Sequence, residues 1–401
     1  MTKVVFEKSL KLTKLSLLIT GIRIDRTNYN RFVAKLLHYL FYFNLSFLYT
    51  DIGAEFWWFF KEMQTGKSFL ELSFCAPCII IALLGTAKCV FLFYHEDLII
   101  NVLNKLRSMH PTLEGNDVPD VDVDEIEEKI VKNSVKCLNL VISLLYYVCT
   151  PVVVSFSLIP VVSMAFHYYQ TGETKYMFPY QVIYFFDPFT KERWPIVYLH
   201  HVWSTVIVAA YVFGSDTLFY ALCTYIQMHF KILRHRFENM VKDSTEETRA
   251  QLVKNIVRHQ ELIELVNQVE ILYSKSTLFN IVTSSVLICL SGFNITTLKD
   301  TSVIILFGTF LYMSLSQISL LCYFGDLLMN SSIQLTGGIY NSLWYETDQE
   351  IKKCILLIII RTQKPCKLTA AKFADLNLSA FTTILSRSWS YFALLRTMYK
   401  E

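Results

Sequence analysis

The chain has 401 residues, of which 53% are hydrophobic and only 18% are charged. Soluble domains carry roughly 25% charged residues, so this composition excludes an ordinary soluble protein. A formal net charge of +3 without a basic stripe also excludes a nucleic-acid-binding protein. The class that remains is an all-α membrane protein, in which the lipid bilayer surrounds the apolar surface.

Seven segments are apolar and long enough to cross a bilayer, which takes about 20 residues of helix. In chain order they are 32–60, 69–94, 137–168, 194–230, 278–298, 303–329 and 373–398. A further apolar run at 354–360 rises only about 10 Å as a helix, so we expect it to pack against protein. Pro365 then separates this short helix from the last span.

Lys and Arg residues are distributed unequally between the two sides of these spans. The segments 1–31, 95–134, 231–275 and 329–372 together carry 25, whereas the alternate segments carry 8. The positive-inside rule therefore predicts an inverted topology, with a cytoplasmic N-terminus and an extracellular C-terminus.

The fourth and fifth helices are predicted to be longer than the membrane is thick. A helix from Trp194 to Met240 would be about 70 Å long, against a hydrocarbon core of roughly 30 Å. Apolar residues continue at heptad spacing past the fourth span and again before the fifth. They are Ile226, Phe230, Leu233, Phe237 and Met240, then Leu252, Ile256, Ile263, Val266, Val269 and Tyr273. We expect a packed cytoplasmic anchor domain, because such stripes need a partner; the alternative is separate amphipathic helices on the membrane surface.

The predicted organisation divides the chain into six regions. They are a cytoplasmic N-terminus at 1–31, transmembrane helices 1–4 at 32–230, anchor helices at 231–277, transmembrane helices 5–6 at 278–329, a cytoplasmic segment with the short helix at 330–372, and the last span with the C-terminus at 373–401.

No enzyme motif is present, so we expect no catalytic residue and no cofactor. Asp120, Asp122 and Asp124 resemble the start of a calcium loop, but Glu125 occupies the position that needs glycine. His200 and His201 are adjacent, which predicts that they point to different helix faces rather than to one metal ion.

Ionisable residues inside the spans are candidates for function, because burying a charge in lipid is costly. Asp51 and Glu55 share one helix face, and Lys88 and Asp216 fall at similar depths where they could pair. The alternative is that these four side chains extend into the lipid headgroups. Arg387 lies near the middle of the last span, too deep to do so easily.

The last third of the sequence resembles the insect odorant receptor family. The similar segments are Tyr340-Asn-Ser-Leu-Trp344-Tyr345, Arg361-Thr-Gln-Lys-Pro365, Phe373-Ala-Asp-Leu-Asn-Leu-Ser-Ala-Phe381 and Ser388-Trp-Ser-Tyr391-Phe392-Ala-Leu-Leu395, with Phe178-Pro179 and Phe186-Asp187-Pro188 before the fourth span. The resemblance implies a tuning subunit of a heterotetrameric, odour-gated, non-selective cation channel. Its partners would be a common co-receptor, a small volatile odorant and the plasma membrane of olfactory sensory neurons. The resemblance also implies a divided seventh helix, with a cytoplasmic anchor half at 330–372 and a pore-lining half at 373–401.

Two other receptor classes are alternatives. A G-protein-coupled receptor would need an extracellular N-terminus, against the distribution of Lys and Arg. A gustatory receptor of the same superfamily is closer, but the segment around Trp389 and Tyr391 is more similar to the odorant branch.

Three sets of candidate site residues follow. Residues in the outer halves of helices 2, 3, 4 and 6 are expected to bind odorant: Phe74, Ile80, Tyr146, Tyr147, Thr150, Trp203, Ile207, Tyr211, Phe307 and Phe310. Apolar and aromatic residues of the anchor region are expected to serve assembly: Phe230, Leu233, Phe237, Met240, Trp344 and Tyr345. One stripe of the last helix is expected to line the pore and, by resemblance, to contain its hydrophobic gate: Arg387, Tyr391, Leu394 and Met398.

Overall fold

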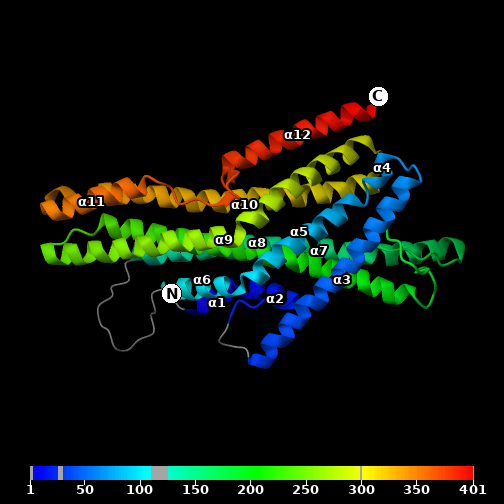
Figure 1. Cartoon of the computed structure of the whole chain (residues 1–401), viewed down its shortest axis with the longest axis horizontal. Coiled ribbons are helices and arrows are strands. Elements are labelled where there is room, and N and C mark those ends of the chain that lie inside the picture. Colours follow the sequence, from blue (N-terminus) through cyan, green and yellow to red (C-terminus); the bar gives the residue numbers. More distant parts are fainter. Residues whose placement is uncertain (1–2, 26–29, 110–124, 299, 401) are drawn as a thin grey trace.

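The structure is a computed structural model that describes residues 3–25, 30–109, 125–298 and 300–400. Four of its helices are much longer than a bilayer is thick and run side by side along the molecule (Figure 1). They are α7 (Glu125–Thr171, 47 residues), α8 (Trp194–Glu238, 45), α9 (Thr245–Thr297, 53) and α10 (Thr301–Asn341, 41). The prediction of two overlong helices is therefore correct for α8 and α9, and it missed α7 and α10.

The other predicted spans also lie in helices. α3 (Arg31–Gln64) contains the first, and α4 (Phe69–Leu72) with α5 (Ala76–Tyr94) form the second. Within the described residues, five helices are long and apolar enough to cross a membrane: Phe69–Tyr94, α7, α8, α9 and α10. α3 and α12 (Leu378–Lys400) are long enough but are not among these five. The predicted all-α membrane fold is confirmed.

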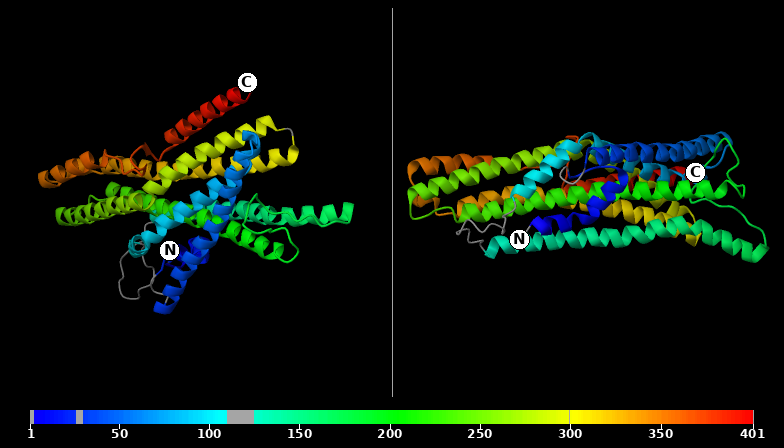
Figure 2. Two further views of the ribbon diagram at one scale, coloured as in Figure 1. Left: turned by 45° about the vertical axis from the view of Figure 1, so that its right-hand side comes forward. Right: turned by 90° about the horizontal axis from the view of Figure 1, so that it is seen from below.

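Helix α8 forms the centre of the bundle. From Gly214 to Phe230 every side chain on α8 is buried, so the helix has no face left for water or lipid. Its C-terminal half packs against the stripe of α9 that contains Leu252, Val266 and Val269, all of them buried. The extensions of α8 and α9 therefore form a packed helical end with α10 and α11 (Gln349–Thr362), and the alternative of separate surface helices is wrong. By contrast, α7 runs along the outside of the bundle (Figure 2).

The N-terminal region contains helices that the sequence analysis did not predict. α1 (Lys3–Ser9) and α2 (Lys11–Thr20) fold against α8, where Leu17 packs beside Gly214. A third, α6 (Glu96–Met109), is amphipathic and follows α5. Short amphipathic helices without a transmembrane-length apolar run give a weak sequence signal, which explains why they were missed. Asp120, Asp122 and Asp124 lie outside the described residues.

The seventh helix is divided, as predicted, but by a small hairpin rather than by Pro365 alone. α11 ends at Thr362, the 3-10 helix η1 (Trp344–Glu346) precedes it, and strands β1 (Thr369–Ala370) and β2 (Ala374–Asp375) pair before α12. The Glu270 carboxylate on α9 accepts a hydrogen bond from the Thr369 amide at 2.7 Å and holds the hairpin. The predicted start of the last span at residue 373 is wrong because α12 begins only at Leu378.

Candidate functional site

A cavity of about 460 Å³ lies between α3, α5, α7, α8 and α10. Its walls are mainly aliphatic, because α7 and α8 turn β-branched and small residues toward it. Examples are Val148 and Val152 on α7 and Val208, Ala209 and Val212 on α8, and Met313 on α10 adds a further apolar side chain. Binding sites for small molecules typically enclose about 300–1,000 Å³ with apolar walls and a few polar groups, so the volume and lining fit a small organic ligand.

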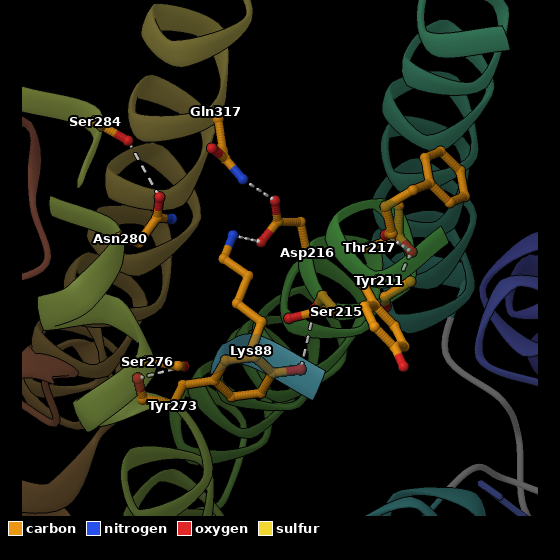
Figure 3. Close-up of polar contacts among 12 residues, drawn as sticks. Lys88, Tyr211, Ser215, Asp216, Thr217, Tyr273, Ser276, Asn280, Ser284 and Gln317 are labelled. Carbon is orange, nitrogen blue, oxygen red and sulfur yellow. Dashed lines mark hydrogen bonds and ion pairs between the residues drawn. The ribbon is translucent and has the colours of Figure 1, made fainter. Parts of the chain in front are cut away.

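The inner end of the cavity carries a buried ion pair. Lys88 Nζ on α5 lies 2.5 Å from Asp216 Oδ1 on α8, and Gln317 on α10 donates to Asp216 Oδ2 at 2.6 Å (Figure 3). Asp216 and Gln317 line the cavity, whereas Lys88 lies behind Asp216. The predicted pairing of Lys88 and Asp216 is confirmed. The alternative that they extend into lipid headgroups is wrong, because Lys88 is only 3% exposed.

The outer end of the cavity carries the two acidic residues of α3. Asp51 and Glu55 are both buried and both line the cavity, so their predicted common face is confirmed. Asp51 accepts hydrogen bonds from the hydroxyls of Tyr180 and Tyr184, which belong to the segment between α7 and α8. Burial next to Asp51 raises the pKa of both Tyr180 and Tyr184, so the two phenols stay protonated and donate. One oxygen of Glu55, Oε2, has no hydrogen-bond partner within the described residues.

His200 and His201 both face Asp51, contrary to the prediction that they would diverge. His200 Nδ1 lies 3.0 Å and His201 Nε2 lies 3.6 Å from Asp51 Oδ1. Adjacent helical residues are about 100° apart, but Asp51 projects between these two positions and both imidazoles are long enough to reach it. The three side chains have the donor types and the proximity that a metal ion requires.

The packed helical end formed by α8, α9, α10 and α11 lies far from Asp51, His200 and His201. At this end, α11 presents an apolar surface. Ile351, Ile355 and Ile358 are buried against the bundle, whereas Leu356, Leu357 and Ile360 are exposed. Four predicted assembly residues lie elsewhere: Phe230, Leu233, Phe237 and Met240 are fully buried within the chain. They therefore stabilise this chain's own fold and offer no contact surface to another subunit. Trp344 is half-buried and Tyr345 is exposed.

Helix α12 turns one face toward α9 and the opposite face away from the chain. Phe392 packs beside Gly292 on α9, and Ser388 is buried on the same face. The four predicted pore residues are all exposed: Arg387, Tyr391, Leu394 and Met398. They form the predicted common stripe, which lies on a flank of α12 beside the face that Ser388 and Phe392 bury.

Comparison with known proteins identifies the family. The sequence profile described as "7tm Odorant receptor" matches residues 68–388, which is most of the chain. The chain belongs to the odorant receptor family. It is 27% identical to Putative odorant receptor 92a of Drosophila melanogaster over 90% of this chain and 87% of that protein. With Odorant receptor 67c of the same species it shares 28% identity over 92% of this chain and 89% of that protein.

The fold of this odorant receptor agrees with a solved structure. The insect olfactory receptor OR5 from Machilis hrabei, in complex with eugenol, superposes with a TM-score of 0.83 at 17% identity, covering 99% of each chain. The family consists of receptors and not enzymes, and it decides against the G-protein-coupled and gustatory alternatives.

Of the ten residues predicted to bind odorant, Phe310 lines the cavity of this receptor and the other nine do not. Tyr146, Tyr147 and Thr150 are exposed on the outer face of α7, and Ile80 is half-buried. Phe74 packs edge-to-face on Phe307 at 5.4 Å. Trp203, Ile207 and Tyr211 share the α8 face turned toward α3, where the Trp203 indole donates to Asn44 at 3.2 Å.

The choice of aromatic residues led the sequence analysis to the wrong helix faces. The α7 residues that line the cavity are mostly not aromatic, with Phe156 as the exception: Val141, Leu144, Leu145, Val148, Cys149, Val152, Val153 and Phe156. Aromatic side chains at a membrane boundary often face lipid, so an aromatic residue does not mark an interior face. The helical spacing of the non-aromatic apolar residues Leu145, Val148, Cys149 and Val152 was the available signal.

Proposed function

We propose that this receptor is the odour-tuning subunit of a heteromeric, odour-gated, non-selective cation channel and that its cavity binds the odorant. The observation that carries the proposal is the cavity of about 460 Å³, which has mainly aliphatic walls and polar groups at its two ends. The fold that it shares with a receptor solved in complex with eugenol supports a small organic ligand.

The chemistry of the lining supports a mostly apolar odorant with one or two polar atoms. Val148, Val208 and Met313 offer burial without hydrogen bonds, and affinity would come mainly from apolar area and shape. Thr205 and Gln317 offer hydrogen-bonding atoms that would orient a hydroxyl or carbonyl group. A site of this kind binds several related volatiles.

The partner in this proposal is a common co-receptor, and the receptor acts in the plasma membrane of olfactory sensory neurons with its N-terminus in the cytoplasm. The exposed apolar residues Leu357 and Ile360 on α11 support assembly at this end of the molecule, because such a surface is favourable only when covered. We expect odour-evoked current from cells that express both subunits and none from cells that express this chain alone. Current from this chain alone would contradict the heteromeric proposal, and epitope tags at both termini on intact cells test the topology.

The exposed stripe of α12 is proposed to line the pore, with Leu394 and Met398 as a hydrophobic gate. A ring of apolar side chains closes a pore by excluding water, and a hydroxyl in that ring favours wetting. Leu394→Ser should therefore raise the current measured without odour. Ala393→Ser introduces a serine at the adjacent exposed position, outside the stripe, and should leave the basal current unchanged.

Equal basal currents in the two serine variants, at equal surface expression, would show that Leu394 is not part of the gate. Arg387 is exposed on the same stripe, so its charge would face the permeation pathway. A cation there opposes cation entry, and we expect Arg387→Gln to raise single-channel conductance.

A further inference from the structure

The cluster of Asp51, His200 and His201 at the outer end of the cavity contains the donor atoms of a transition-metal site. These residues come from α3 and the second turn of α8, and their ligand atoms all lie within 4.8 Å of one another. We propose that this cluster binds a divalent transition-metal ion of the zinc class and that the ion links α3 to α8. The proposal does not depend on odour binding, because metal binding is measured on the receptor alone.

The spacing of the donor atoms fits tetrahedral coordination. Zinc binds imidazole nitrogen and carboxylate oxygen at about 2.0–2.1 Å, which separates neighbouring ligand atoms by about 3.3–3.4 Å in a tetrahedron. Asp51 Oδ1 lies 3.0 Å from His200 Nδ1 and 3.6 Å from His201 Nε2, on either side of that value. Side-chain adjustments among atoms that all lie within 4.8 Å of one another would therefore convert the hydrogen-bonded cluster into a metal site.

A fourth donor is already in position. The Tyr184 hydroxyl oxygen lies 3.2 Å from Asp51 Oδ1 and 2.9 Å from His201 Nε2, which are again near-tetrahedral separations. This oxygen, or a water molecule that replaces it, completes the coordination. The choice of two imidazoles and one carboxylate favours zinc-class ions over Ca²⁺ and Mg²⁺, which prefer oxygen ligands throughout.

Neighbouring side chains hold the three ligands in orientation. Thr50 Oγ1 contacts His200 Nε2 at 3.0 Å, so the Nδ1 atom of this ring is the one turned toward Asp51. The Tyr180 ring stacks on His201 with centroids 4.4 Å apart, and its hydroxyl donates to Asp51 Oδ2 at 2.9 Å. Such outer contacts are typical of built metal sites, where they fix ring orientation.

Charge and access also fit a cation. Among the described residues, Asp51 forms ion pairs only with the two histidines, and the buried Glu55 lies one helical turn further along α3. The Asp51 carboxylate, which forms no ion pair with Lys or Arg among the described residues, attracts a divalent ion. The His200 side chain is 18% exposed, which gives the ion a route from water.

Binding would affect the cavity, because Asp51 and Tyr180 line it. An ion held by α3 and α8, close to Tyr184, fixes the segment between α7 and α8 over the outer end of the cavity. That segment is already attached to α3 through the Ile183 amide, which donates to the Ala54 carbonyl at 3.3 Å. We therefore expect zinc applied from outside to alter the odorant concentration needed for half-maximal current.

The test is cobalt and zinc titration of the purified full-length receptor in a Cys137→Ser, Cys354→Ser background, which removes two exposed thiols. Co²⁺ should give the visible absorption of a tetrahedral complex, and Zn²⁺ should displace it and raise the melting temperature, whereas Mg²⁺ should do neither. His200→Gln should lower metal affinity by at least about 100-fold, since losing an outer partner alone costs about 10–100-fold. His167→Gln, a histidine on α7 outside the cluster, should bind as the parent does.

A second variant separates ligation from a structural role. In His200→Cys a thiolate takes the ligand position, so the cobalt complex should gain a sulfur-to-metal charge-transfer band. Three results would overturn the proposal: no tetrahedral cobalt spectrum in the parent, the same metal affinity in His200→Gln, or no charge-transfer band in a folded His200→Cys receptor. In each case the cluster is only a hydrogen-bond network that closes the cavity.

Discussion

The buried ion pair of Lys88 and Asp216 determines how much stability the receptor loses when either residue is replaced. Their charges lie 2.5 Å apart away from water, and Gln317 satisfies the second carboxylate oxygen. A buried charge that loses its partner is strongly unfavourable, whereas removing both charges together is often neutral. Each of the two residues is therefore needed for stability only because the other charge is buried beside it.

We expect Lys88→Met to lower the free energy of unfolding by about 3–5 kcal/mol, because Asp216 is then left buried without its cation. The double variant Lys88→Met, Asp216→Leu should recover most of that loss. Thermal unfolding of the purified receptor measures both. A double variant no more stable than Lys88→Met would show that the two charges do not act as a pair.

Glu7 is a single residue on which the attachment of the N-terminal helices depends. Partial burial raises the pKa of this carboxyl, but hydrogen bonds and charges from Lys14 on α2 and Arg107 on α6 outweigh it and hold the pKa below the usual value. A carboxyl whose pKa is lower in the folded state stabilises the fold above its unfolded pKa of about 4.5, and this contribution is lost as the pH falls through the folded value.

Acidification below about pH 4.5 should therefore loosen α1 and α2 in the parent receptor more than in Glu7→Gln. Glu7 is partly exposed, so solvent screens the ion pairs and we expect the contribution to be below about 1 kcal/mol. Hydrogen exchange of the α1 and α2 amides as a function of pH measures the difference. The same pH dependence in both proteins would refute a role for these ion pairs.

Helices α8 and α10 depend on a glycine for their close approach. A Cβ atom at Gly338 on α10 would lie 2.6 Å from the Arg234 carbonyl oxygen on α8, whereas nothing lies within 4 Å of a Cβ atom at Gly337. These adjacent glycines therefore form a matched pair for testing the packing of the two helices.

Gly338→Ala should destabilise the receptor by about 1–3 kcal/mol, because the two backbones must move apart. Gly337→Ala should stabilise it by about 0.5–1 kcal/mol, because alanine favours the helix and nothing obstructs its methyl group. Melting temperatures of the two variants decide this. Equal shifts would contradict the packing of α8 on α10 at this point.

The positions of the helices in this receptor could be predicted better than which face of each helix lines the cavity. Runs of about 20 apolar residues mark membrane helices directly, and the seam at Phe230, Leu233 and Phe237 marked the extension of α8. The hairpin at 369–375 could not be predicted, because its strands have two residues each and depend on Glu270 and Ser274 of α9. The faces of the helices were predicted wrongly for a related reason. In lipid both the outer and the inner faces are apolar, so hydrophobicity alone does not separate the exposed Tyr147 from the cavity-lining Val148.

At the scale of the whole molecule, the bundle keeps its fold while the sequence varies, as the 17% identity over 99% of both superposed chains shows. The overlong helices carry the packing, with α8 buried at the centre and α11 covering the end of the bundle. This leaves the aliphatic lining of the cavity free to vary in size and shape. Differences in odour tuning among related receptors would then arise from positions such as Val148, Ala209 and Met313.

The most direct test of the cavity as the odour site is the concentration–response curve of Ala209→Phe beside that of Ala210→Phe. Ala209 lines the cavity and the adjacent Ala210 does not, so the same added ring fills the cavity in one variant only. Overfilling a packed site costs about 1–3 kcal/mol, which corresponds to roughly a 5- to 150-fold increase in the odorant concentration for half-maximal current. We predict that increase for Ala209→Phe and no change for Ala210→Phe at equal surface expression; equal responses from both variants would contradict odour binding in this cavity.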